Sequence, residues 1–409
     1  MDIVLFVSPG IKSATYFILT ETKNDLNCLS CKKKMDKMIN TRFAKFYKVL
    51  FLLTFLSVLF VTGCSDVKLP ALGAEDEIIV VADSADYLQL QESLSAVFCK
   101  IIKTPQNEQL YNLKRINYEK LSFYKQRKNL IIISPLNSET EISKYLKSIL
   151  DAKVAEKVNA GEEFVFNKYD LWARNQIVMI MASPDIESLN RNILKEQENL
   201  LYYVQNLSNK RIAESLYNDQ YEKKDIEGKF LKNYGWMIYV QADYLLAKEV
   251  PEDNFVWLRR SPGTDMERWL FVHWIENASP NLLHPDSVFA IRDKITKKYY
   301  RTMDDTTYVM SVDMDDYKFV SEVNFLGRYA LMTNALWKMS DNTMGGPFIN
   351  YTFYDEKTHR IYMLDGSIFA PKFEKKKLIQ QMDVTLQSFL TESEVPAERK
   401  EDLFDSMND

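Results

Sequence analysis

The chain has 409 residues, a net charge of −5 at pH 7, 46% hydrophobic residues and 27% charged residues. These values are ordinary for a globular protein with a real core, and the length leaves room for two domains. The mild negative charge argues against nucleic-acid binding, which usually requires a strongly basic face. Only 11 glycines are present, which disfavours phosphate-cradling loops.

The first informative segment is an apolar run at 49–61, which follows three basic residues within 42–48. A basic stretch before an apolar run of this length is typical of a signal peptide. The run is too short for a membrane-spanning helix, which needs about 20 apolar residues. The residues upstream make an over-long start, so we expect translation to begin at Met35 or Met38. We expect 1–63 to be a leader that is removed.

The segment 61–65 reads VTGCS and resembles the lipobox of bacterial lipoproteins. The thiol of Cys64 is the atom that would take the diacylglyceryl group, and small flanking residues let the peptidase reach the backbone. Two or more acyl chains, such as palmitate, anchor a protein firmly. We therefore expect a membrane partner through lipid on Cys64 and a tether at 64–75. The location would be the cell envelope, on the periplasmic side of the inner or outer membrane or at the cell surface.

The other cysteines offer little chemistry. Cys28 and Cys31 form a C-x-x-C pair, but no second pair or partner histidine accompanies them, and they lie in the leader. Cys99 lies on the apolar side of an expected helix, where we interpret it as a small buried hydrophobic residue.

Alternating strands and helices are expected in a first domain at 76–220. Asp83 can cap the helix that follows the first strand, and the 183–185 sequence SPD supplies a cap, a proline and a first-turn carboxylate for a long helix. Apolar runs predict strands at 77–82, 129–134 and 176–182.

A second domain at 233–391 is expected to be richer in strands. A helix is predicted after His284, and a terminal amphipathic helix at about 374–390. The segment 392–409 is polar and acidic, and we expect it to be loose. Strands are predicted at 235–241, 254–259, 267–275, 306–312, 327–339, 348–354 and 360–369.

An internal repeat suggests that the two halves are related. A hairpin followed by a long helix occurs at 164–216 and again at 348–390, and the openings 79–83 and 238–243 are similar. Hairpin–helix units are also common by chance. The expected fold class is α+β: two related α/β-sandwich-like halves, each a mixed or antiparallel sheet packed by helices.

No known catalytic arrangement is present. G-x-S-x-G, the Walker loop, G-x-G-x-x-G and H-E-x-x-H are all missing, and no cofactor or metal is implied. His273 alternates with apolar residues on a strand, which favours a satisfied core histidine. His284 precedes a proline at a helix start, which favours a capping or loop role, and His359 falls in a hairpin turn.

Carboxylate clusters occur at 304–305 and 313–316. They could take a hard cation, but they lack the glycine and the terminal glutamate of a calcium loop. Solvated turns beside strands explain them more simply. If the protein were an enzyme, Asp304 and Asp313 would be candidates for an acid–base pair.

Aromatic residues and glycines of the second half supply the candidate ligand-binding residues. Aromatic strands can form a platform for sugars, peptides or a partner, or they can be sheet core. Paired glycines permit close backbone approach, or simply a tight connection. Two arginines could meet an anion, or could pair with Glu267 or Asp265. The candidates are Gly345, Gly346, Trp337, Trp269, Arg259 and Arg260.

Several segments together resemble an uncharacterised family of Bacteroidota-type envelope lipoproteins, classed as a domain of unknown function. They are the lipobox, the strand 78–83, the WARNQ sequence at 172–176, and GGP at 345–347 followed by the helix after Ala370-Pro371. The resemblance covers nearly all of the mature chain. It implies the envelope location and carries no functional motif.

Two classes of function remain open. The first is a non-catalytic envelope protein that binds a ligand or partner, such as an envelope protein or a glycan, across a cleft between its halves. The absence of a catalytic set favours it. The second is a hydrolase of cell-wall or glycan material. Two carboxylates facing each other across a concave pocket at about 5–10 Å would indicate the hydrolase.

Overall fold

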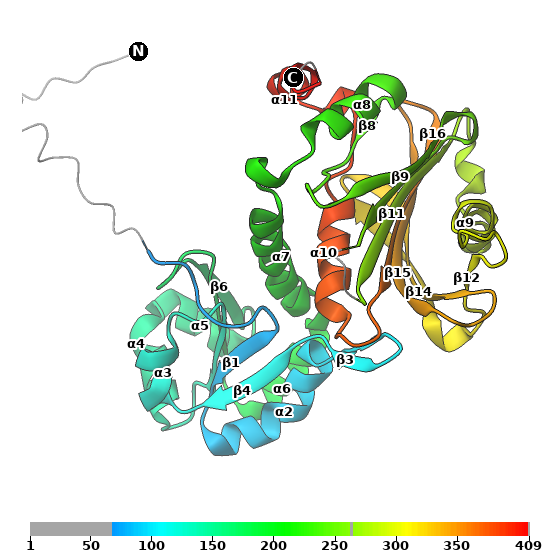
Figure 1. Cartoon of the computed structure of the whole chain (residues 1–409). Helices are drawn as coiled ribbons and strands as arrows, with labels where there is room; N and C mark the ends of the chain where they lie inside the picture. Colours follow the sequence, from blue (N-terminus) through cyan, green and yellow to red (C-terminus); the bar gives the residue numbers. More distant parts are fainter. Residues whose placement is uncertain (1–67, 262–264, 408–409) are drawn as a thin grey trace, which may run out of the picture. The chain divides into compact units, whose positions relative to one another are not determined.

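A computed structural model describes residues 68–261 and 265–407. The predictions on the leader, on Cys28, Cys31 and Cys64, and on the start of the tether lie outside these residues. From Lys68 onward the chain forms one compact unit that contains two large sheets and two two-stranded ones (Figure 1). No helix within 68–261 or 265–407 is long and apolar enough to cross a membrane.

The first sheet has five strands in the order β4-β1-β5-β7-β6. Four of them are parallel, and β6 pairs antiparallel with β7. The central strands are continuous apolar runs because helices cover both faces. The strands are β1 (Glu77–Val81), β4 (Asn112–Ile116), β5 (Asn129–Pro135), β6 (Val165–Tyr169) and β7 (Ile177–Ser183).

Two layers of helices enclose this sheet. One face packs against α2 (Ser84–Phe98), α6 (Ile186–Lys195) and α7 (Gln197–Leu216). The opposite face packs against α3 (Leu121–Tyr124), α4 (Glu141–Ile149) and α5 (Ala152–Ala160). Asp83 caps α2 as expected by accepting from Ala85 N. The cap of α6 is Asp185, which accepts from Ser188 N, and not the expected Ser183, because the helix begins only at Ile186.

The second sheet has eight strands and is antiparallel throughout. Its main path runs β12-β14-β15-β16-β11-β10-β9, and β13 pairs with β14 beside β12. The strands are β9 (Leu245–Val250), β10 (Phe255–Arg260), β11 (Glu267–Ile275), β12 (Val309–Ser311), β13 (Lys318–Phe325), β14 (Arg328–Met339), β15 (Gly345–Asp355) and β16 (Arg360–Phe369).

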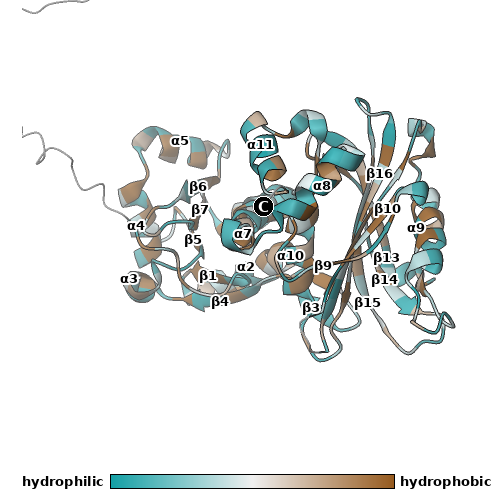
Figure 2. Cartoon of the chain, turned by 45° about the horizontal axis from the view of Figure 1, so that its top comes forward, coloured by the Kyte–Doolittle hydropathy of each residue, from teal (hydrophilic) through white to brown (hydrophobic). Residues whose placement is uncertain are grey.

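Helices lie on both faces of the second sheet as well, as Figure 2 shows. The helix α9 (Pro285–Tyr299) packs on one face. The other face packs against α8 (Lys224–Tyr234) and α10 (Lys376–Leu386). Beside them, β8 (Trp236–Met237) pairs with β17 (Leu390–Thr391).

A hairpin of the first half reaches the start of α10. It consists of β2 (Ile101–Lys103) and β3 (Asn107–Gln109). The Glu108 carboxylate accepts the backbone N–H groups of Lys375 and Lys376 at 2.8 and 2.9 Å. These are orphan donors of the first helical turn, so the hairpin caps α10 from a distant part of the chain.

The mixed helix-and-sheet fold with two sheet-rich halves confirms the expected fold class. The relationship between the halves does not extend beyond the hairpin–helix unit. In the first half β1 is a central parallel strand, whereas residues 238–243 form no sheet strand. A five-stranded sheet with four parallel strands and an eight-stranded antiparallel sheet do not superpose over most of their strands, so the predicted duplication is wrong at the level of the whole domain.

The segment after Thr391 was expected to be loose, and this is also wrong. It forms α11 (Ala397–Asp405), in which Leu403 is fully buried. Arg399 of this helix donates to Glu227 of α8 at 2.8 Å. Lys224 at the start of α8 also pairs with Asp402 at 3.0 Å. One buried apolar residue and these polar contacts therefore hold an otherwise polar helix, which composition alone does not reveal.

The visible part of the predicted tether is likewise held in place. Ala71 N donates to Arg174 O at 2.9 Å, and Leu72 N donates to Gln126 O at 2.8 Å. Backbone bonds of this kind fix the segment from Leu69 onward to the body of the first half.

Candidate functional site

The predicted ligand residues Gly345 and Gly346 lie inside β15, paired with Lys338 and Trp337 of β14. A Cβ on Gly346 would lie 2.0 Å from the carbonyl oxygen of Ile368, so only glycine fits there. The glycines therefore allow close strand packing. The tight connection that the sequence left open as an alternative does not lie at these glycines, because both are strand residues.

Trp337 and Trp269 meet in the core on the α9 side, with ring centroids 4.8 Å apart. Both are buried. The indole of Trp337 donates to Ile368 O at 3.1 Å, and that of Trp269 donates to Glu267 at 2.7 Å. The structure thus brings Gly346 and the two tryptophans together as sheet core and not as an open platform.

Arg259 and Arg260 are engaged in ion pairs. Arg259 binds Glu267 through two bonds of 3.0 and 2.6 Å, and Arg260 pairs with Asp243 at 2.5 Å. The bidentate pair is the cross-strand contact that was the simpler alternative. Glu267 thus joins Arg259 to the indole of Trp269, and the binding of a ligand by these six residues stays a prediction.

The three histidines have structural partners. His273 is half-buried, its Nδ1 lies 3.0 Å from Asn254 O, and burial lowers its pKa. His284 caps α9 by accepting from the N–H of Asp286, as expected. The Nδ1 of His359 lies 3.0 Å from the hydroxyl of Tyr354 in the hairpin turn. Within the described residues, no group of three or more metal-ligating side chains forms a metal site.

Asp304 and Asp313 are exposed turn residues. Hydrogen bonds from Thr302 and Thr306 lower the pKa of Asp304, and Lys318 lowers the pKa of Asp313. A general acid needs a raised pKa, so neither carboxylate is suited to that role.

Another pair of carboxylates, Asp355 and Glu394, lines a cavity together with Arg328. Arg328 binds them at 3.1 and 2.5 Å. Burial opposes ionisation, but hydrogen bonds from Thr358 and Arg328 lower the pKa of Asp355, and those from Arg328 and Thr391 lower that of Glu394. Both carboxylates are therefore held ionised by a cation, which does not provide the acid–base pair of a glycosidase.

The candidate site is a groove of about 750 Å³ between α10, α7, the β2–β3 hairpin and the strands β13–β15. We call it the α10 groove. Its volume falls within the usual range for small-molecule sites. Apolar side chains supply one wall, from alternate positions of the strands: Phe319, Val323 and Phe325 of β13, Met332 of β14, and Ile349 of β15.

Polar groups converge on the same space. Carboxamides come from four elements: Asn206 of α7, Asn324 of β13, Asn334 of β14, and Gln380 and Gln387 of α10 and its C-terminal end. Asp383 is the one charged side chain among the described residues that line the groove. Apolar walls with a few convergent polar groups are typical of ligand sites.

Asp383 has a defined geometry on α10. Its Oδ1 accepts from the hydroxyl of Tyr351 at 2.6 Å and from Nε2 of Gln387 at 2.8 Å. Its Oδ2 has no hydrogen-bond partner among the described residues. Burial raises the pKa of Asp383, and the two hydrogen bonds offset this only in part. Burial also raises the pKa of Tyr351. A carboxyl group with a raised pKa in a pocket is a functional-site candidate.

Helical spacing places this group in the groove. Ile379, Asp383 and Gln387 are four residues apart, so they share one side of α10 and its C-terminal end, whereas Met382 and Leu386 face the sheet core. The sequence patterns did not point to Asp383. The stripe at 379, 383 and 387 was the signal that could have found it.

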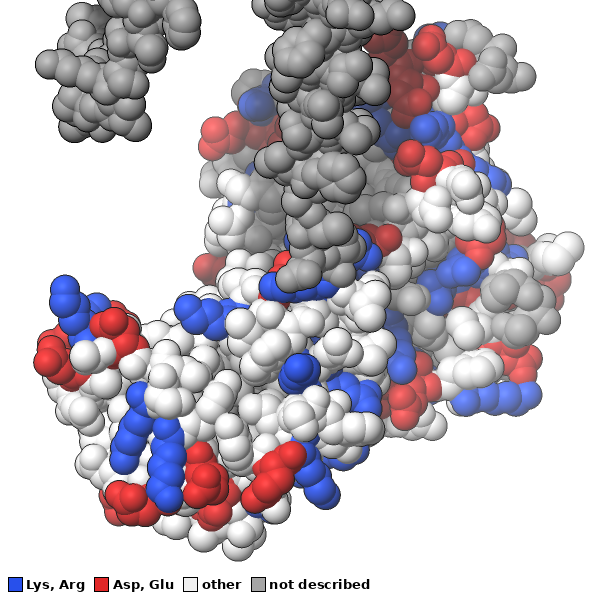
Figure 3. All heavy atoms as spheres, turned by 90° about the vertical axis from the view of Figure 1, so that its left-hand side faces the viewer, with Lys and Arg blue, Asp and Glu red and all other residues white. Residues whose placement is uncertain are grey.

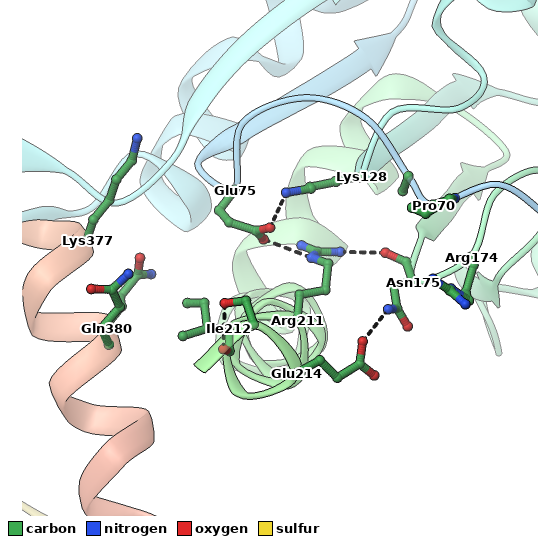
Figure 4. A pocket seen from close by; sticks show the side chains of 13 residues that line it. Pro70, Glu75, Lys128, Arg174, Asn175, Arg211, Ile212, Glu214, Lys377 and Gln380 are labelled. Carbon is green, nitrogen blue, oxygen red and sulfur yellow. Dashed lines mark hydrogen bonds and ion pairs between the residues drawn. The ribbon is translucent and has the colours of Figure 1, made fainter. Parts of the chain in front are cut away.

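A second, smaller pocket of about 430 Å³ lies where 70–75, 174–175, the end of α7 and α10 meet. Figure 4 shows its polar lining. Arg211 donates to Glu75 at 2.8 Å and to Asn175 O at 3.0 Å, and Lys128 pairs with the same glutamate. These three charges are paired with one another, so the cluster links residues 70–75 to α7.

Family models match both halves of the chain, and both are described as domains of unknown function. Residues 71–217 match a family model described as a domain of unknown function (DUF8532), and residues 222–388 match another described as a domain of unknown function (DUF4837). The two matches cover the two sheets separately. No curated protein matches the chain.

Some solved structures show weak similarity. Two are of Mog1: a mutant of protein Mog1, and the Saccharomyces cerevisiae Ran-binding protein Mog1p. They are 10% and 8% identical, cover 38% and 39% of this chain and 90% of their own, and have TM-scores of 0.25. The human StarD13 lipid transfer and protein localization domain is 12% identical, with a TM-score of 0.18, and covers 36% of this chain and 87% of its own. At these scores we draw no conclusion from them.

Proposed function

We propose that the mature chain begins at Cys64, is anchored in the cell envelope by lipid on that residue, and binds a ligand in the α10 groove without chemical conversion. The basic stretch, apolar run and lipobox support the anchor. One observation carries the binding role: Asp383 presents an unpartnered oxygen inside an otherwise uncharged groove.

The lining indicates the kind of ligand. No lysine or arginine is among the described residues that line the groove, so an anion has no counter-charge there. A cationic or hydroxyl donor can bind Asp383, and an apolar body can lie against Phe325 and Ile349. Carboxamides such as Asn334 and Gln380 suit the hydroxyl or amide groups of a glycan or peptide. The ligand is therefore amphipathic and neutral or cationic.

A groove-filling substitution tests the binding role. Nile red, a neutral apolar dye, is the probe. Asn334→Trp places a large ring in the groove, and we expect it to weaken dye binding at least tenfold. Gln380→Trp fills the groove from the opposite wall and should act alike. Ala160→Trp, at an exposed position of α5, is the control and should leave binding unchanged.

Cooperative unfolding of each variant in urea, like that of the wild type, shows that the substitution leaves the protein folded. If both groove variants bind the dye as well as the control does, the α10 groove is not the ligand site.

Metabolic labelling tests the anchor separately. The wild-type precursor, expressed in a bacterium with lipoprotein-processing enzymes, should incorporate labelled palmitate, and Cys64→Ser should not. Equal labelling of the two proteins, or none in either, would contradict lipidation at Cys64.

A further inference from the structure

The amino-terminal ends of the parallel strands gather three segments at one edge of the first sheet. The strands β1, β5 and β7 are parallel neighbours, so the residues that precede them, 68–76, 121–128 and 170–176, lie side by side. Backbone bridges join Pro70 to Arg174 and Leu72 to Arg127. We call these three segments the amino edge.

The amino edge exposes large apolar side chains. Leu69 is 68% exposed, Leu72 57%, Phe123 77% and Leu171 38%. Single exposed apolar residues are common, but several on adjoining segments mark an interaction surface.

The positive side chains of the amino edge are less often paired than its negative ones. Lys125 and Arg174 are exposed, and their side chains have no ion-pair partner among the described residues. Two of the three acids of the same segments are paired: Glu75 binds Arg211 and Asp76 binds Lys376, both at 2.8 Å. The third, Asp170, is exposed, and within the described part of the chain its carboxylate accepts only from Gln176 N–H, whereas Lys68 adds a third exposed cation without an ion pair there. Figure 3 shows white and blue spheres prevailing where the described chain begins. The edge therefore combines apolar side chains with uncompensated positive charge.

We propose that the amino edge lies against the surface of an anionic lipid bilayer, with Leu69, Leu72, Phe123 and Leu171 in the interface and Lys125 and Arg174 at lipid phosphates. This rests on the proposed lipid at Cys64. Leu69 follows Cys64 by five positions, so this end of the amino edge stays within about 17 Å of the anchor. Surfaces that bind membrane interfaces combine apolar side chains, which enter the interface, with lysine and arginine, which contact anionic lipids.

The experiment imposes the anchor chemically, so that it does not depend on native processing. The mature chain from Cys64 with Cys99→Ala carries one thiol, which is coupled to a maleimide lipid in vesicles. A ketone-bearing phenylalanine analogue placed at position 123 carries a nitroxide label. The control carries it at position 88, where Leu88 of α2 is 73% exposed near the opposite edge of the sheet.

Oxygen and a nickel chelate serve as the two relaxation probes. On vesicles with phosphatidylglycerol, the ratio of oxygen to nickel accessibility at position 123 should rise at least threefold over the uncoupled protein. At position 88 it should not change. An unchanged ratio at 123 in the coupled protein would overturn the proposal.

Charge is tested in the same system. Lys125→Glu with Arg174→Glu should reduce the rise at position 123, and so should neutral phosphatidylcholine vesicles. An equal rise on both vesicle types would overturn the assignment of the bases to lipid phosphates. Absence of palmitate labelling would count against the proposed anchor alone and leave this result as it stands.

Discussion

The hydroxyl of Tyr351 donates to the carboxyl of Asp383 at 2.6 Å and joins β15 to α10 at the floor of the α10 groove. This bond uses one carboxyl oxygen and leaves the other directed to the groove. The same residue therefore connects the architecture of the second half with the proposed ligand chemistry.

The raised pKa of Asp383 predicts a pH dependence of stability. In the unfolded chain the residue ionises near its ordinary pKa of about 4, whereas in the folded protein burial delays ionisation. Unfolding then releases a proton, so this group lowers stability as the pH rises above about 4. Asp383→Asn keeps an acceptor for Tyr351 and lacks this effect.

Urea unfolding at pH 4, 5.5 and 7 measures this effect of Asp383 on the free energy of unfolding. The free energy of unfolding of the wild type should fall relative to Asp383→Asn as the pH rises. Asp316→Asn, at an exposed turn, should run parallel to the wild type. A constant difference between wild type and Asp383→Asn would contradict the raised pKa.

The cap on α10 predicts a local loss of stability. Glu108→Ala removes the acceptor of the Lys375 and Lys376 N–H groups and should destabilise the protein by about 1–2 kcal/mol. Hydrogen exchange of these two amides should accelerate as well. Glu92→Ala, at an exposed site on α2, is the matched control. Unchanged exchange in Glu108→Ala would show that the cap contributes nothing.

Glu227 predicts a second pH effect, at the contact between α8 and α11. It is fully buried and accepts from Val240 N at 2.7 Å and from Arg399 at 2.8 Å. Burial, aided by the nearby Glu222 carboxylate, raises the pKa of Glu227 to about 9. The folded protein keeps this proton at pH 7 and loses it on unfolding, so stability should fall between about pH 4.5 and 9.

Glu227→Gln should flatten that decline. Urea unfolding at pH 5, 7 and 8.5 compares the two proteins, and the difference in favour of the variant should grow with pH. Parallel pH profiles for the wild type and Glu227→Gln would contradict the assignment.

Among these substitutions, we expect the one that breaks a buried ion pair to lower the free energy of unfolding most. Arg292 of α9 and Asp365 of β16 are fully buried and lie 2.7 Å apart, and the guanidinium carbon lies 3.5 Å from the ring centroid of Phe348. Arg292→Met leaves a buried carboxylate without its cation and should cost about 3–5 kcal/mol of unfolding free energy. Adding Asp365→Asn should recover part of the loss, because it removes that charge. No recovery would point to lost packing instead.

The regular parts of the fold follow from sequence patterns. Strand β11 has the predicted bounds, and the central strands of the first sheet follow from their apolar runs. Three edge strands, β4, β9 and β13, were missed because they mix polar with apolar residues and are half-exposed. The helix expected after Asp185 is broken at Glu196, which ends α6 and precedes α7.

The candidate site could not be predicted because its parts are distant in the sequence. Tyr351 and Asp383 are 32 residues apart, and the groove also takes residues from α7 and the β2–β3 hairpin. Glycine is common in loops that bind ligands, but the group that lies close to Gly346 is the Ile368 carbonyl. A glycine pair permits either use, and packing decides between them.

Native mass spectrometry of the protein gently extracted from its own membranes tests the central claim most directly. We predict a mass equal to the chain from Cys64 plus its acyl groups, with a further non-covalent ligand that is lost in Asn334→Trp and kept in Ala160→Trp. An unacylated chain, or a ligand retained equally by both variants, would contradict the account.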